Sequence, residues 1–300
     1  MNPIISIVNM YFSSLRRKVR RGIKRRCSIR GERFLLDRPS LPPVEAYRYL
    51  PTTEAKKPMP LVINVHGGAW VRGDALVLDT ESGMIADSLG ATVLNLNYKK
   101  LDRHPFPYAQ EELFSLAKHY IDNADRYGID KNRVVLMGYS AGAHLCAVAV
   151  QMLRDVGISV YYQVLCYPFT DFTYGGGTQK EIKDELDKVK LMDKVFFSEI
   201  SRENPLASPG INPNLSGLPS TIITTCGNDP LRVQGEAYAK RLADEGIKVA
   251  LICDVEAIHG YMECNYPETA EDPSKNPTQE ALCRNTLGRI LQQLKDDSIG

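Results

Sequence analysis

The chain has 300 residues, a formal net charge of +1 at pH 7, and 43% hydrophobic residues. This length suits one large domain, or a domain with a small appendage, and the hydrophobic content is enough to fill a core, which excludes an intrinsically disordered chain. The balanced charge indicates no polyanionic partner, so we expect no nucleic acid to bind. No apolar run is long enough to predict a membrane-spanning helix.

The seven cysteines are scattered along the chain and contain no Cys-x-x-Cys pair. Several of them lie in apolar stretches, which favours buried reduced thiols over disulfides. The first residues are apolar and the next are basic, which is the reverse of the order in a secretory signal. We therefore expect a cytoplasmic protein. No histidine–carboxylate cluster has metal-ligand spacing, so we expect neither a metal nor another cofactor.

Residues 1–33 are predicted to form an amphipathic basic helix. Apolar side chains recur at helical spacing from Ile4 to Val19, and a dense run of positive charge extends from Arg16 to Arg26. The favoured interpretation is a helix that forms part of a cap over an active site. Contact with an anionic membrane surface and a partly mobile terminus stay open, and binding of nucleic acid is the weakest alternative.

Residues 34–300 alternate between predicted strands and predicted helices. The predicted strands are 44–50, 61–65, 91–96, 133–137, 160–166, 221–226 and 248–253. The predicted helices are 82–89, 108–123, 143–153, 233–245 and 279–295. Because buried strands alternate with helices, we predict an α/β fold with a mostly parallel central sheet and helices on both faces.

One stretch interrupts this alternation. The segment between the strand that ends at Cys166 and the strand that starts near Thr221 is far longer than a crossover between parallel strands needs. We predict a cap insertion at about 170–210 within the 34–300 domain. The glycines at 175–177 stand at its root, where they would let it move.

A glycine–serine motif stands between a buried strand and an Ala-rich helix. It reads Gly138-Tyr139-Ser140-Ala141-Gly142. The order of strand, sharp turn and helix is typical of a nucleophile elbow, in which small flanking residues let the chain turn and expose the serine hydroxyl. The alternative is an ordinary turn with a serine at the helix N-cap. The rest of the chain decides between the two, and it favours Ser140 as a nucleophile.

A nucleophilic serine needs a base and an acid that orients the base. In this kind of fold they follow the serine in the order acid, then histidine, each on a loop after a later strand. Asp229 and His259 stand at two such strand ends. Asp254 and Glu256 are rival acids, but they lie on the segment that carries His259 itself. We therefore predict a catalytic set of Ser140, Asp229 and His259.

The loop after the first buried strand contains His66-Gly67-Gly68. Glycines let backbone N–H groups approach an oxyanion with no Cβ in the way. We predict an oxyanion hole made by the amides of Gly67, Gly68 and Ala141.

Four motifs follow one another along the chain: His66-Gly67-Gly68-Ala69-Trp70, Gly138-Tyr139-Ser140-Ala141-Gly142, Asp229-Pro230-Leu231-Arg232 and His259-Gly260-Tyr261. As a set they resemble the hormone-sensitive-lipase-like esterases, a branch of the α/β hydrolases, over about residues 40–295. The resemblance implies an α/β-hydrolase fold and hydrolysis of carboxylic esters, usually with short acyl chains. It also implies the roles of nucleophile for Ser140, base for His259 and orienting acid for Asp229. The family often has an N-terminal helical cap, which agrees with the interpretation of residues 1–33.

The sequence departs from the family pattern in the glycine loop and before the nucleophile. Ala69 stands where the family's glycine run ends, and Tyr139 stands where an acidic residue is common. These departures bear on substrate and acyl preference, and we take Trp70 and Tyr139 as candidate substrate-binding residues. The expected substrates are small-molecule esters, with acetyl esters of small molecules or sugars among the candidates.

Two other functions stay open at this point. The segment Ser140–His144 also looks like kynurenine formamidases, which share the fold and the triad, so an arylformamidase-like amide hydrolase is one alternative. A non-catalytic ligand-binding protein on a hydrolase scaffold is the other. Such proteins usually lose a triad member, whereas this chain keeps all of them. The sequence leaves both the oligomeric state and peripheral membrane contact by the N-terminus open.

Overall fold

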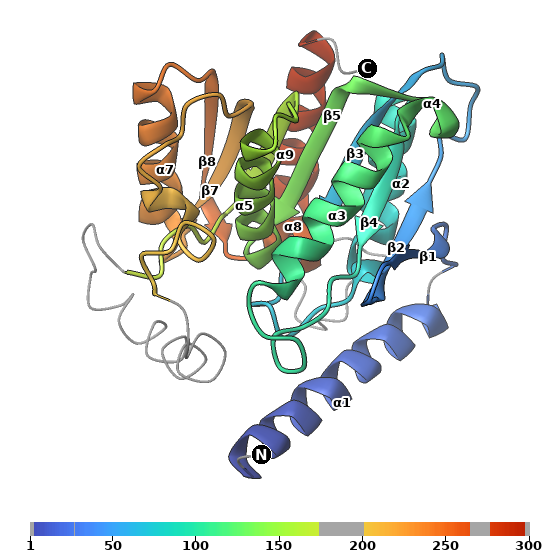
Figure 1. Ribbon diagram of the computed structural model, residues 1–300, viewed down its shortest axis with the longest axis vertical. Coiled ribbons are helices and arrows are strands. Elements are labelled where there is room, and N and C mark those ends of the chain that lie inside the picture. The colour runs from blue at the N-terminus through green and yellow to red at the C-terminus, as the bar shows by residue number, and fades with distance from the viewer. Residues whose placement is uncertain (1–2, 27, 174–200, 265–276, 298–300) are drawn as a thin grey trace.

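The computed structural model describes residues 3–26, 28–173, 201–264 and 277–297, and its centre is one eight-stranded sheet (Figure 1). The strands are β1 (Glu32–Arg38), β2 (Leu41–Tyr49), β3 (Met59–Val65), β4 (Thr92–Leu96), β5 (Ile129–Tyr139), β6 (Tyr162–Cys166), β7 (Ser220–Asn228) and β8 (Val249–Ile258). They lie in the order β1-β2-β4-β3-β5-β6-β7-β8. Strands β3 to β8 pair in parallel, whereas β1 and β2 pair antiparallel at one edge. The predicted mostly parallel sheet is therefore confirmed.

Helices cover both faces of this sheet. The helical elements are α1 (Pro3–Arg26), η1 (Ala75–Leu78), α2 (Asp79–Leu89), α3 (Tyr108–Asp122), α4 (Ala124–Tyr127), α5 (Ala141–Asp155), η2 (Pro209–Ile211), α7 (Arg232–Asp244), α8 (Tyr261–Cys264) and α9 (Pro277–Asp296). Apolar side chains of α3, α5 and α7 share one buried cluster, and those of η1, α2 and α9 share a second. Figure 1 shows α3 and α5 in front of the sheet and α9 behind it. None of the described helices is long and apolar enough to cross a membrane.

The parallel strands and the five predicted helices occur where the sequence pattern predicts them, with ends that differ by a few residues. Strand β1 was not predicted. It forms an antiparallel hairpin with β2, and most of its side chains are exposed or half-buried. Phe34 and Leu36 pack against the core and Leu35 between them is exposed, so three consecutive apolar residues hide the alternation in the sequence.

Helix α1 accounts for most of the helix predicted within residues 1–33. It stands apart from the two helical layers, beside the edge of the sheet at which the parallel strands end (Figure 1). Near its C-terminal end, the side chain of Ile23 is fully buried in the cluster that also holds Tyr47. Most of the predicted cap insertion, residues 174–200, lies outside the described residues.

Candidate active site

The elbow at Ser140 is a tightly constrained turn at the carboxyl edge of the sheet. Ser140 has φ of 51° and ψ of −115°, an unfavourable conformation for a residue with a side chain. A Cβ on Gly142 would collide with the carbonyl oxygen of Val65, and one on Gly138 would collide with that of Gly142. The serine side chain makes no capping hydrogen bond to α5. The geometry therefore matches a nucleophile elbow and not a serine N-cap.

The side chains of Ser140, His259 and Asp229 form one hydrogen-bonded line. His259 Nε2 lies 2.8 Å from Ser140 Oγ, and His259 Nδ1 lies 2.7 Å from Asp229 Oδ2. The other carboxylate oxygen of Asp229 accepts a hydrogen bond from the amide of Leu231 at 2.8 Å. With Nδ1–H donating to the buried carboxylate, the Nε2 lone pair faces the serine hydroxyl. The three predicted residues are thus brought together in the geometry that proton transfer needs.

The rival acids have other contacts. Asp254 accepts a hydrogen bond from the hydroxyl of Tyr261 at 2.7 Å and lies 3.7 Å from a guanidinium nitrogen of Arg289. The carbonyl oxygen of Glu256 accepts a hydrogen bond from the side-chain amide of Gln279, and its side chain is exposed. Asp254 is therefore a structural acid between β8 and α9, and neither residue orients His259.

The glycine loop after β3 requires one correction to the predicted oxyanion hole. The amide of Gly67 donates to Glu263 Oε1 at 2.6 Å, so this N–H is already used and the prediction for Gly67 is wrong. The loop continues through Gly68 and Ala69, which both have positive φ, of 110° and 49°. Within the described part of the chain, the amides of Gly68, Ala69 and Ala141 have no hydrogen-bond acceptor. The sequence interpretation did not include the free amide of Ala69, although the residue's place in the glycine run pointed to it.

Buried polar groups beneath this loop hold its backbone in place. The carbonyl oxygen of Gly67 accepts hydrogen bonds from the hydroxyl of Tyr98 at 3.0 Å and from His66 Nδ1 at 2.6 Å. Burial lowers the pKa of His66 well below its usual value, so the ring is neutral, and its Nε2 accepts from Lys100 Nζ at 3.1 Å. Burial also raises the pKa of Glu263 to about 7. Glu263 was not predicted, and its only signal was a place four residues after His259, on α8.

An aromatic cluster stands one helical turn from the nucleophile. The indole N–H of Trp70 donates to His144 Nδ1 at 3.2 Å, and His144 Nε2 donates to the carbonyl of Ala207 at 2.9 Å. Burial lowers the pKa of His144 to about 4, which keeps this ring neutral and able to make both contacts. The rings of Phe169 and Phe172 pack on Trp70 at centroid distances of 5.5 and 5.3 Å. Trp70 is only 4% exposed, so these contacts hold it within a buried aromatic cluster.

Tyr139 does not fit the predicted role of substrate contact. Its side chain is fully buried, its ring packs against Tyr167 at 6.2 Å, and its hydroxyl has no hydrogen-bond partner among the described residues. Tyr167 in turn packs edge-on against His259 at 5.1 Å. Because strand residues alternate between faces, the residue before the elbow serine points into the core, and Tyr139 supports the ring that supports His259.

The fold and the elbow define an α/β hydrolase. A family model described as alpha/beta hydrolase fold matches residues 62–263, which include Ser140, Asp229 and His259. The chain belongs to this family, in its hormone-sensitive-lipase-like branch. The expectation that the motifs raised is therefore confirmed for the family and for the fold.

Similar proteins include several esterases. An arylesterase of Saccharolobus solfataricus is 35% identical over 193 residues, which cover 62% of this chain and 63% of that protein. Esterase LipI of Mycobacterium tuberculosis is 30% identical over 237 residues, which cover 76% of this chain and 73% of that protein. Among solved structures, an esterase of Pyrobaculum calidifontis is 27% identical with a TM-score of 0.79, over 99% of this chain and 94% of that one.

Proposed function

We propose that the protein is a serine carboxylesterase that hydrolyses short-chain acyl esters through an acyl-enzyme. The observation that carries the proposal is the hydrogen-bonded line from Asp229 through His259 to Ser140, with distances of 2.7 and 2.8 Å. The similar proteins named above as esterases support the same reaction class.

In the first half of the reaction, Ser140 Oγ attacks the ester carbonyl carbon while His259 Nε2 takes the hydroxyl proton. Asp229 keeps Nδ1 of the imidazole protonated and stabilises the imidazolium that forms. The negative charge moves to the carbonyl oxygen, where we assign the amides of Gly68, Ala69 and Ala141 as donors. Such donors are worth about 3 kcal/mol each in a transition state. His259 then gives its proton to the leaving alcohol.

In the second half, water replaces the alcohol. His259 Nε2 takes a proton from the water, the hydroxide oxygen bonds to the acyl carbon, and the bond to Ser140 Oγ breaks as the serine regains its proton. The products are the free acid and the restored enzyme, so no cofactor is required.

We also propose that α1 and the insertion at about 170–210 form a cap that shapes the acyl and alcohol pockets, with Trp70 in the wall next to the nucleophile. The position of α1 beside the ends of the strands supports this assignment. Acetyl esters of small molecules or sugars are candidate substrates. We also propose a cytoplasmic location, with contact between the N-terminus and a membrane surface as the alternative to its role in the cap.

The function is tested with the variant Ser140→Ala. We expect kcat for short p-nitrophenyl esters to fall by about 10⁴-fold or more, because the nucleophile is lost. Ser216→Ala is the matched control, since its side chain is exposed and away from the elbow, and it should keep the activity of the wild type. Unchanged hydrolysis by Ser140→Ala would exclude the assignment.

The non-catalytic alternative is tested on the same pair of proteins. A fluorophosphonate should form one covalent adduct on Ser140 in the wild type and none in Ser140→Ala. A wild type that forms no adduct and hydrolyses none of the esters would favour a ligand-binding protein on a hydrolase scaffold.

A further inference from the structure

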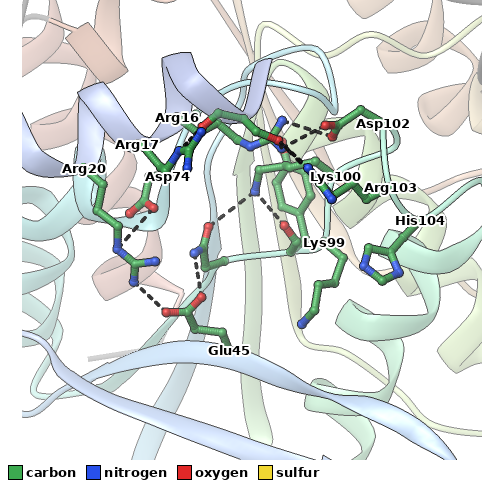
Figure 2. A pocket seen from close by; sticks show the side chains of 14 residues that line it. Arg16, Arg17, Arg20, Glu45, Asp74, Lys99, Lys100, Asp102, Arg103 and His104 are labelled. Carbon is green, nitrogen blue, oxygen red and sulfur yellow. Dashed lines mark hydrogen bonds and ion pairs between the residues drawn. The ribbon is translucent and has the colours of Figure 1, made fainter. Parts of the chain in front are cut away.

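A cavity of about 390 Å³ lies between α1 and the segment that follows β4 (Figure 2). Its walls also include Glu45 on β2 and Asp74 before η1, and they contain no residue of the Ser140–His259–Asp229 set. The lining carries the cations Arg16, Arg17, Arg20, Lys99, Lys100 and Arg103. The fold has thus brought positive charge from two distant segments of the chain to the walls of one cavity, outside the Ser140–His259–Asp229 set.

Part of this positive charge is neutralised within the walls. Arg16 lies 2.9 Å from the buried carboxylate of Asp102, and Arg20 lies 2.6 Å from Glu45 and 3.6 Å from Asp74. These ion pairs dock α1 onto the sheet edge and use all three acids of the lining. Lys99 is paired with Glu112, outside the cavity, at 3.4 Å.

Three cations of the lining have no such partner. Across the described ranges, no carboxylate lies within ion-pair distance of Arg17, Lys100 or Arg103. Like charges held together in a hollow create a strong positive potential, and an anion that enters relieves it.

The two arginines converge on one point at the mouth of the cavity. Arg17 Nε donates to the carbonyl oxygen of Ser13 at 3.3 Å, and Arg103 Nε and Nη2 donate to Ser13 Oγ at 3.3 and 3.2 Å. Both side chains are otherwise exposed, so most of their N–H groups are available. Paired guanidinium groups of this kind suit the planar oxygens of a carboxylate and the oxygens of a phosphate.

Lys100 lies deeper in the same cavity. Its side chain is only 7% exposed, and Nζ contacts the carbonyl oxygen of Tyr98 at 2.6 Å, His66 Nε2 at 3.1 Å and Asn97 Oδ1 at 3.3 Å. These acceptors are neutral. Burial lowers the pKa of Lys100 from 10.5 to about 7, because no carboxylate pairs with the buried amine. An anion bound above it would favour the charged form through the electric field and would not need a further N–H donor.

We propose that this cavity binds a small soluble molecule through a phosphate or carboxylate group, held by Arg17 and Arg103 at the mouth with Lys100 beneath. The volume leaves room for a group larger than the anion itself. The site is independent of the esterase proposal, because binding needs neither Ser140 nor its partners.

The test is calorimetric titration of the full chain with inorganic pyrophosphate and with citrate, at an ionic strength held constant with sodium chloride. We expect saturable binding of at least one of them, with one ligand per chain. Arg17→Ala and Arg103→Ala should each raise Kd by about tenfold or more, since each removes a charge-assisted hydrogen-bond donor. Arg21→Ala is the matched control: it removes the same charge from the exposed side of α1, outside the lining, and should leave Kd unchanged.

Two results would overturn the proposal. One is the absence of saturable binding of both anions. The other is an equal loss of affinity in Arg21→Ala and Arg17→Ala, which would indicate diffuse attraction to a basic helix. Phosphatidylserine vesicles distinguish a lipid headgroup as the source of the anion, because binding to vesicles without binding of pyrophosphate or citrate would assign the basic helix to a membrane surface instead.

Discussion

Glu263 fixes the loop that leads to the proposed oxyanion hole. Its carboxylate accepts the hydrogen bond from the amide of Gly67 at 2.6 Å, and so settles which amides of the loop stay free. A carboxylate placed away from water is unfavourable, which is why burial raises its pKa from 4.5 to about 7. Glu81 is buried nearby, and burial together with the charge of Glu263 raises its pKa as well.

We predict that Glu263→Gln changes how stability depends on pH. The folded state binds the Glu263 proton more tightly than the unfolded state, so the wild type loses free energy of unfolding as the pH rises from about 4.5 to about 7. Glutamine keeps an acceptor for Gly67 but has no charge, so the loss of free energy of unfolding that is due to Glu263 should disappear, while the part due to Glu81 stays. Urea denaturation at pH 5 and pH 7.5 measures the free energy of unfolding of both proteins.

The control for this experiment is Glu236→Gln, at a partly exposed position on α7. It should keep the slope of the wild type. If Glu263→Gln and the wild type lose equal stability between the two pH values, Glu263 does not titrate in this range and its assigned pKa shift is incorrect.

Gly142 is the residue on which the elbow depends. We predict that Gly142→Ala loses most of its folded yield or its esterase activity, because the new Cβ would meet the carbonyl oxygen of Val65 and neither backbone segment can yield. Gly288→Ala on α9 is the control. Nothing lies near its Cβ, and alanine favours a helix by up to about 1 kcal/mol over glycine. Folded yield, ester hydrolysis and the melting temperature are measured for both variants. Equal values for Gly142→Ala and Gly288→Ala would contradict the prediction.

At the scale of elements, α1 is joined to the domain by arginine side chains as well as by the apolar side chains of Phe12, Val19 and Ile23. Arg16 reaches both the carbonyl oxygen of Val71 and the carboxylate of Asp102, and Arg20 reaches Glu45. Asp102 is fully buried as a side chain, so removal of either partner leaves the other charge poorly solvated and unpaired, which costs more than the loss of a surface ion pair. The basic run that makes this segment resemble a membrane-binding or nucleic-acid-binding helix therefore serves in part to dock it.

We predict that Asp102→Asn loosens α1. Loss of the carboxylate leaves the guanidinium of Arg16 without its charge partner, so trypsin should cleave within the arginine-rich helix several-fold faster than in the wild type. Asp122→Asn removes an exposed acid paired with Lys118 and is the control that should not change the cleavage rate. An unchanged rate in Asp102→Asn would mean that other contacts hold α1.

At the scale of the whole molecule, the residues of the candidate active site all lie at the carboxyl edge of the parallel sheet. The loop after β3 supplies the amides that we propose for the oxyanion hole, the turn after β5 supplies Ser140, and the ends of β7 and β8 supply Asp229 and His259. Adjacent parallel strands end at the same edge, so residues far apart in the chain meet there. The basic cavity lies along the same edge, on the side where α1 crosses it (Figures 1 and 2).

The sequence by itself determined the alternation of strands and helices, the elbow, and the meeting of Ser140, Asp229 and His259. Each of these follows from local patterns, because a turn motif directly after a buried strand can be located from the sequence, and all parallel strands end at the same edge of the sheet. The same reasoning missed β1, because Phe34, Leu35 and Leu36 are consecutive and only the pairing with β2 decides that Phe34 and Leu36 face the core.

Only the tertiary structure decided which amides of the glycine loop are free, that Tyr139 faces the core, and that Arg17 and Arg103 meet at Ser13. These depend on contacts between segments far apart in sequence. Gly67 and Glu263 are separated by 196 positions, and Ser13 and Arg103 by 90. Such pairs cannot be predicted from a local sequence pattern, because each residue is compatible with the secondary structure of its own segment. The contact forms only when the sheet brings the two segments together.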